Sequence, residues 1–201
     1  MKEKRRDLTR EHIVRHRNLV EELNTTEFSN TLLDISECCY ESLMNGGKII
    51  FMGNGGSAAD AQHLAAELVG RYLQERKPLA AVALSVNSSI LTAVANDYSY
   101  NDVFTRQLEA IGREGDVAVG ITTSGSSRNV VDALSKAREM NIKTIAFTGE
   151  NIDTLKEVSD IILSIPGDET PIIQEMHIMA GHIICGIIEK MVCAKEVEGQ
   201  L

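Results

Sequence analysis

The sequence predicts an α/β fold, a three-layer α-β-α sandwich around a five-stranded parallel sheet, with N-terminal helices added. Short apolar runs alternate with helical patterns along the chain, which is typical of parallel strands joined by crossover helices. No internal repeat, low-complexity tract or Pro/Gly linker divides the 201 residues, and a hydrophobic content of 43% suffices for one sizeable core. We therefore expect a single domain over residues 1–201, in which residues 1–45 are a helical extension.

The expected elements alternate in the order that this fold requires. Two helices open the chain, and the second ends at Asn45-Gly46-Gly47, a typical helix stop. Five short apolar segments are then predicted as strands, and segments with helical spacing follow them. Parallel strands with short crossovers place ligands at their carboxyl ends. In chain order we expect helices over 5–23 and 26–45, a strand over 48–53, a helix over 57–72, a strand over 79–85, helices over 88–97 and 102–112, a strand over 117–124, a helix over 127–140, a strand over 143–149, a short helix near Thr154, a strand over 160–166 and a helix over 170–192.

The charge distribution argues against nucleic-acid and membrane partners. With a net charge of −9, a general surface for nucleic acid or acidic lipid is not expected. The basic residues within 1–17 precede NLVEELNTTE, which lacks the apolar core of an export signal and fits a solvated amphipathic helix. The uncharged run from Pro78 to Asn96 contains the polar turn Ser85–Ser89, which favours two buried elements over a membrane span.

The cysteines indicate a reducing compartment. Cys38, Cys39, Cys185 and Cys193 have no metal-knuckle spacing, and two of them are adjacent. Reduced thiols packed in helices are the default interpretation of such a set. We therefore expect a cytoplasmic protein.

The segment GNGGSAADAQHLAAE, from Gly53 to Glu67, joins an apolar strand to a helix. Asp60, His63 and Glu67 fall within an arc of about 60° on one face of that helix. A glycine turn able to hold an anion therefore lies next to side chains able to hold a metal or move protons. The simpler interpretation is an ordinary glycine-rich turn, with Ser57 and Asp60 as a capping box.

The third strand ends in a loop of similar character, with five hydroxyl side chains among six residues. Such a loop at a helix N-terminus favours an anion, because backbone N–H groups and the helix dipole point towards it. Neither loop contains Lys or Arg, which suits the phosphate monoester of a small molecule. In the simpler interpretation, Ser126 or Ser127 only caps the following helix. The loop is Thr122-Thr123-Ser124-Gly125-Ser126-Ser127.

The last predicted helix is apolar nearly all round and should be buried in the core or in a subunit interface. Gln174 and His182 lie about 80° apart in helical projection, and polar side chains on so apolar a helix need partners. His63 and Glu67 could supply them through a divalent ion such as zinc. For His177 we favour a hydrogen-bonded core residue.

Together these motifs resemble the phosphoheptose isomerases of the sugar isomerase (SIS) domain superfamily, which implies a flavodoxin-like SIS domain. The resemblance runs from Lys48 to Met191 and rests on GNGGSAADAQHxxxE, AxxND at Ala93–Asp97, T-S-G-x-S and QEMHxxxGH. It implies isomerisation of sedoheptulose 7-phosphate to D-glycero-D-manno-heptose 7-phosphate through an enediol, which supplies heptose for lipopolysaccharide or other surface glycans. It also implies a cytoplasmic homotetramer with one zinc ion per subunit.

Carried over by position, the resemblance assigns the site residues. It implies zinc ligation by His63, Glu67, Gln174 and His182. An aldose–ketose interconversion needs a base, an acid and oxyanion stabilisation, for which we expect Glu67, His182 and zinc, with Asp60 as a further proton carrier. Expected substrate contacts are Asn54, Gly55, Gly56, Ser57, Glu67, Asn96, Asp97, Thr122, Thr123, Ser124, Ser127 and Gln174.

Two alternatives stay open. DnaA initiator-associating proteins of the same superfamily bind another protein and are not known as isomerases, but they tend to lack the equivalent of His182, which this chain has. An isomerase of another ketose phosphate would use the same chemistry. Ile172 stands where phosphoheptose isomerases commonly have Arg, which bears on the sugar preference.

Overall fold

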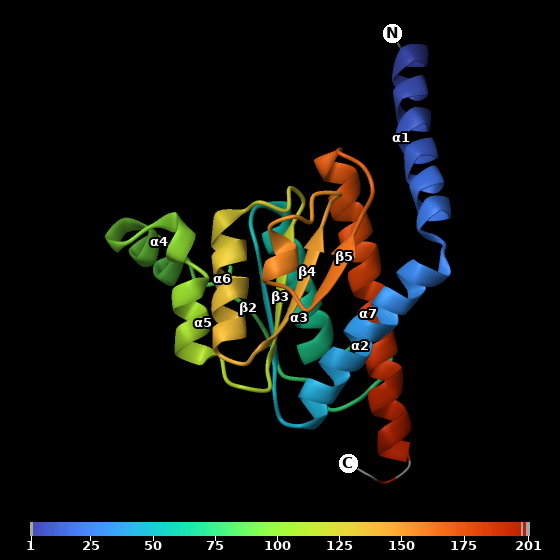
Figure 1. The fold of residues 1–201 in the computed structure, drawn as a ribbon. Helices are drawn as coiled ribbons and strands as arrows, with labels where there is room; N and C mark the ends of the chain where they lie inside the picture. The colour runs from blue at the N-terminus through green and yellow to red at the C-terminus, as the bar shows by residue number, and fades with distance from the viewer. Residues whose placement is uncertain (1, 198, 200–201) are drawn as a thin grey trace.

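The computed structural model describes residues 2–197 and Gly199, and it confirms the predicted α-β-α sandwich (Figure 1). Within the described residues the sheet has five strands, all parallel, in the order β2-β1-β3-β4-β5. In this flavodoxin-like order the direction of winding reverses between β1 and β3, which opens a ligand crevice outside their carboxyl ends. The strands are β1 (Ile49–Gly53), β2 (Ala81–Ala83), β3 (Val117–Thr122), β4 (Lys143–Thr148) and β5 (Ile161–Ser164).

Helices cover both faces of the sheet (Figure 1). Three of them, α2, α3 and α7, pack on one face, and α5 and α6 pack on the other. The first helix, α1, extends away from the body, and α4 projects outward beside α5 and α6. The helices are α1 (Lys2–Leu23), α2 (Thr26–Met44), α3 (Gly56–Val69), α4 (Ser88–Asp97), α5 (Thr105–Ile111), α6 (Arg128–Glu139) and α7 (Thr170–Val197), with 3-10 turns η1 (Tyr100–Asp102) and η2 (Leu155–Glu157).

Alternate residues of each strand feed two apolar cores. Ile49 and Phe51 of β1 pack against the α2, α3 and α7 layer, whereas Ile50 and Met52 pack against the opposite layer. Because both faces are covered, β1 has no polar side chain on either face. Residues Thr170–Lys195 of α7 are long and apolar enough to cross a membrane, but half of their most apolar window is buried within the protein. We interpret α7 as a core helix.

Several predicted elements have different ends in the structure. The strand predicted over 79–85 shortens to β2, an edge strand that pairs with β1 alone. The helix predicted over 102–112 begins later, as α5 at Thr105, and the 3-10 turn η1 precedes it. The last helix continues beyond residue 192, to Val197.

The helix predicted over 57–72 ends early, at Val69, for an identifiable reason. The Arg76 guanidinium, which is fully buried, donates hydrogen bonds to the carbonyl oxygens of Glu67, Leu68 and Gly70. Carbonyls at a helix end lack intrahelical partners, so Arg76 supplies them. Sequence periodicity carries no sign of such a contact.

Candidate active site

The turn after β1 brings α3 and α7 close together. Gly55 has a φ of +57°, a conformation that favours glycine, and it is the N-cap of α3 without a side-chain hydrogen bond. Ser57 lies buried inside the helix, so the capping-box interpretation is wrong. A Cβ on Gly56 would lie 2.6 Å from both Nε2 and Oε1 of Gln174. The amide of Gln174 therefore occupies the space that a side chain at residue 56 would fill.

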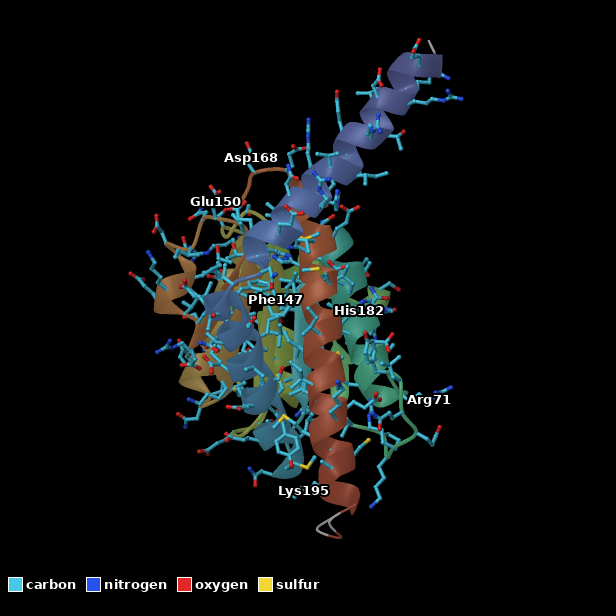
Figure 2. All side chains as sticks on the ribbon, turned by 90° about the vertical axis from the view of Figure 1, so that its right-hand side faces the viewer. Arg71, Phe147, Glu150, Asp168, His182 and Lys195 are labelled. Carbon is cyan, nitrogen blue, oxygen red and sulfur yellow. The ribbon has the colours of Figure 1, made fainter. Side chains whose placement is uncertain are left out.

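The structure brings three predicted ligands together between α3 and α7. Nε2 of His63 lies 2.8 Å from Nε2 of His182 and 3.3 Å from Oε1 of Glu67. Figure 2 shows His182 pointing from α7 towards α3. The helices approach closely because Gly181 has no side chain: a Cβ there would lie 2.5 Å from Cδ2 of Leu64. Convergence of His63, Glu67 and His182 is thus a consequence of helix packing.

The donor set of this cluster fits a divalent metal. One ligand atom from each of His63, Glu67 and His182 lies within 4.8 Å of the others. Two Nε2 atoms in contact need a proton or a cation between them, and imidazole with carboxylate is a typical zinc set. Gln174 is eight residues before His182, about 12 Å along the helix axis. Its amide lies beside Gly56, at the start of α3.

Asp60 lies one turn before His63 on α3. Its Oδ2 is buried and has no hydrogen-bond partner among the described residues. Burial raises the pKa of this carboxyl from 3.8 to about 6, and the nearby His63 opposes the rise. A carboxyl with such a pKa can take up and release a proton close to neutral pH.

The hydroxyl loop lies next to the glycine turn because β1 and β3 are neighbours, with Gly53 opposite Ile121. Ser127 is the N-cap of α6, but its hydroxyl contacts Thr122 Oγ1 at 2.9 Å and caps no backbone N–H. Ser124 and Ser126 pair similarly, at 3.1 Å. The interpretation of these serines as simple helix caps is therefore wrong. Gly125 has a φ of +67°, and a Cβ there would lie 1.9 Å from the carbonyl oxygen of Asn151.

Two residues that sequence analysis missed connect these loops. Asn54 and Asn129 exchange hydrogen bonds through their side-chain amides at 2.9 Å, and the Tyr100 hydroxyl donates to Asn54 Oδ1 at 3.0 Å. In this structure Asn54 thus braces the turn against α6 and η1. A polar residue on the buried face of a predicted helix was a signal for Asn129, whereas nothing in the sequence pointed to Tyr100.

Asn96 and Asp97 lie at the exposed end of α4, hydrogen-bonded to each other at 2.8 Å.

The buried carboxylate of Glu189 lies about two turns after His182 on α7, next to the His63, Glu67 and His182 cluster. Glu189 of α7 accepts hydrogen bonds from the backbone N–H groups of Tyr72, Leu73 and Gln74 at 2.8–2.9 Å, and its Oε1 lies 3.4 Å from Nε of Arg76. This network holds the segment after α3 against α7. The ring of Tyr72 consequently lies 5.7 Å from that of His182. Sequence analysis missed Glu189, Arg76 and Tyr72.

His177 is the hydrogen-bonded core residue that the sequence predicts. It is fully buried, and its Nε2 contacts the carbonyl oxygen of Thr148 at 3.1 Å. Burial lowers the pKa of the imidazole to about 4, although the contact with Thr148 opposes the shift. His177 is therefore neutral at physiological pH.

Comparison with known proteins identifies the family. Residues 12–149 match the SIS domain family. A phosphoheptose isomerase of Akkermansia muciniphila is 53% identical over 156 residues, which are 78% of this chain and 82% of that protein. Solved phosphoheptose isomerases of Neisseria gonorrhoeae and Francisella tularensis match with TM-scores of 0.86 and 0.87 and identities of 39% and 33%, over 92% of this chain and 98% and 97% of theirs. The chain therefore belongs to the phosphoheptose isomerase family of SIS-domain proteins.

Proposed function

We propose that this protein converts sedoheptulose 7-phosphate to D-glycero-D-manno-heptose 7-phosphate. The observation that carries the proposal is the convergence of His63, Glu67 and His182 next to two phosphate-type loops, in a chain 53% identical to a phosphoheptose isomerase. This arrangement supplies groups for proton transfer beside groups for anion binding. An aldose–ketose interconversion of a sugar phosphate requires both.

The proposed reaction is a proton transfer between neighbouring carbons. Glu67 takes a proton from C1 of the ketose, and an enediol forms. His182 protonates the C2 carbonyl oxygen, after opening the sugar ring where needed; Glu67 then returns its proton to C2 while the O1 hydroxyl gives its proton back to His182, which leaves the C1 aldehyde. Asp60, with its pKa near 6, is the further proton carrier. His63, Glu67, Gln174 and His182 would hold one zinc ion per subunit, which would supply polarisation of the carbonyl, and substrate binding would rearrange these ligands so that Glu67 and His182 can transfer protons.

Phosphate binding is assigned to the two loops. Backbone N–H groups at the starts of α3 and α6, together with the loop hydroxyls, are neutral donors suited to a phosphate monoester. Lys and Arg are absent from both loops, although Arg128 directly follows the second. We propose substrate contacts from Asn54, Gly55, Gly56, Ser57, Glu67, Asn96, Asp97, Thr122, Thr123, Ser124, Ser127 and Gln174.

We also propose the wider setting of the enzyme: a cytoplasmic homotetramer that supplies heptose for lipopolysaccharide or other surface glycans, without nucleic-acid or membrane partners. Subunit packing is supported by exposed apolar side chains beside one groove, Leu33 at 43% exposure on α2 and Ile183 at 41% on α7. We propose that residues 1–201 act as a single SIS domain, in which residues 1–45 are the helical extension.

The second candidate is an isomerase of another ketose phosphate. Ile172 stands in place of the Arg common in phosphoheptose isomerases, so a cationic side chain that could contact the substrate or a neighbouring subunit is replaced by an apolar one, which is the reason to test this candidate. A non-catalytic adaptor role fits less well, because His182 is present and contacts His63.

A substrate comparison tests the proposal. Zinc-loaded protein is assayed with sedoheptulose 7-phosphate, fructose 6-phosphate and ribulose 5-phosphate, and aldose formation is followed by NMR. We expect the highest kcat/KM with the heptulose. A higher value with a shorter ketose would favour the second candidate. Turnover of none of the three would favour the adaptor.

A further inference from the structure

A second group of metal-binding side chains lies outside the active site, where α1 meets the start of α7. His12 and His16 are one turn apart on α1, and Glu175 faces them from α7. One ligand atom from each lies within 4.8 Å of the others. Figure 2 shows the C-terminal half of α1 against the N-terminal end of α7. The fold therefore assembles the group from positions 159 residues apart.

Hydrogen bonding defines which ring nitrogen of His16 is available to bind a metal ion. Its Nδ1 lies 2.9 Å from the carbonyl oxygen of His12, an acceptor only, so Nδ1 carries a proton. A carbonyl partner at Nδ1 is the usual way in which proteins orient a metal-binding imidazole and leave Nε2 free. Nε2 of His16 contacts Oε2 of Glu175. An imidazole lone pair and a carboxylate oxygen in contact need a cation between them, either a proton or a metal ion.

The surroundings leave the group open to an ion from solvent. His12 is exposed, and the side chains of His16 and Glu175 are 23% and 49% exposed. The adjacent cation, Arg15, is paired with Glu169 at 2.6 Å. Glu175 follows Gln174 directly, and consecutive side chains on a helix point about 100° apart. The group thus lies on a different face of α7 from Gln174.

We propose that His12, His16 and Glu175 form a second metal site, for Zn²⁺ or a similar divalent transition-metal ion, that ties α1 to α7. Two histidines at i and i+4 present their rings on one helix face, a spacing that zinc enzymes use. Zinc bonds of about 2.0–2.1 Å place neighbouring ligand atoms roughly 3.3 Å apart, so small side-chain rotations suffice for coordination. Water completes the tetrahedral set. This proposal stands independently of the proposed function.

Metal stoichiometry tests the second site. Full-length protein is stripped with a chelator and dialysed against micromolar Zn²⁺, and bound zinc is measured by mass spectrometry. We expect two ions per chain in the wild type, one in the double variant His63→Ala/His182→Ala and one in His12→Ala/His16→Ala. Arg15→Ala is the matched control, because it removes a tie between α1 and the body but leaves all ligands in place. It should keep both ions.

The same variants separate a metal site from an ion pair. If only a proton joins His16 to Glu175, His63→Ala/His182→Ala binds no zinc and His12→Ala/His16→Ala binds as much as the wild type. Either result would overturn the proposal. Circular dichroism confirms that each variant is folded. Loaded with Co²⁺, His63→Ala/His182→Ala should show the visible d–d absorption of a nitrogen- and oxygen-ligated ion, and Glu175→Gln added to it should weaken or abolish that absorption.

Discussion

Replacement of Glu189 by Gln tests whether the buried network that Glu189 forms with Arg76 and the backbone of residues 72–74 stabilises the protein. Glu189 and Arg76 have side chains only 2% and 0% exposed, and Glu189 also accepts three backbone N–H groups. The substitution keeps the shape of the side chain but removes its charge. It also turns one acceptor oxygen into a donor that faces backbone N–H groups.

The expected loss follows from these contacts. Breaking a buried ion pair costs about 3–5 kcal/mol, because the remaining charge is left uncompensated. Arg76 keeps hydrogen bonds to four carbonyl oxygens, those of Glu67, Leu68, Gly70 and Lys77, which reduce the cost. At least one N–H loses its acceptor, at about 1–3 kcal/mol, and the two costs overlap because the groups are in contact. We therefore expect a loss of about 3 kcal/mol.

Urea unfolding at fixed protein and zinc concentrations measures this loss. Glu75→Gln is the matched control: its carboxylate is 90% exposed and pairs with Arg71 at 3.7 Å, and such exposed pairs contribute about 0–1 kcal/mol. A loss below about 1 kcal/mol in Glu189→Gln, or one equal to that of Glu75→Gln, would refute the reasoning.

Three further predictions concern protons. Glu67→Gln should reduce kcat by about 10²–10⁴-fold with little change in secondary structure, because it removes the proposed base; wild-type turnover in stopped assays would exclude Glu67 as that base. Asp60→Asn should raise the free energy of unfolding at pH 7 by about 1 kcal/mol. Between pH 3.8 and about 6 the carboxyl of Asp60 keeps its proton in the folded protein but loses it in the unfolded chain. Above this window the ionised Asp60 therefore lowers the free energy of unfolding. Urea titration of metal-free protein at pH 7 checks this, and a loss of stability would contradict it. For His177 the sign is opposite: the unfolded state binds more protons between pH 4 and 6.5, so stability should fall on acidification through this window, by up to roughly 3 kcal/mol. His177→Gln should lose less than the wild type over the same pH range in unfolding titrations, and parallel curves would show that His177 does not titrate on unfolding.

The sequence predicted the parts of the molecule that follow a period or a local rule. Alternating apolar strands and helices determine the sandwich, and His63 and Glu67 share a face because they are four residues apart. His182 was foreseen for a different reason, since a polar side chain on an apolar helix needs a partner. Their contact at 2.8 Å then follows from the close helix packing at Gly181.

The parts that were missed depend on long-range contacts of loops. Glu189 is a charged side chain on the apolar α7 and so needs a partner, but Tyr72 lies 117 residues away in a loop whose local sequence gives no sign of the contact. The same is true of Tyr100, which reaches Asn54 across 46 residues. Loop residues have no hydrophobic period, so their partners become visible only when the sheet and helices are assembled. The early end of α3 at Val69 has the same origin, in the docking of Arg76.

Isomerisation in deuterated water tests the central claim most directly. Purified, zinc-loaded protein is incubated with sedoheptulose 7-phosphate in D₂O, and NMR follows aldose formation and deuterium at C2, with His182→Ala as the control. We predict aldose that carries deuterium at C2 and its loss in the variant, because an enediol takes its new proton from a group that exchanges with solvent. Absence of conversion by the wild type, or equal conversion by His182→Ala, would contradict the assignment of this site as a heptulose phosphate isomerase.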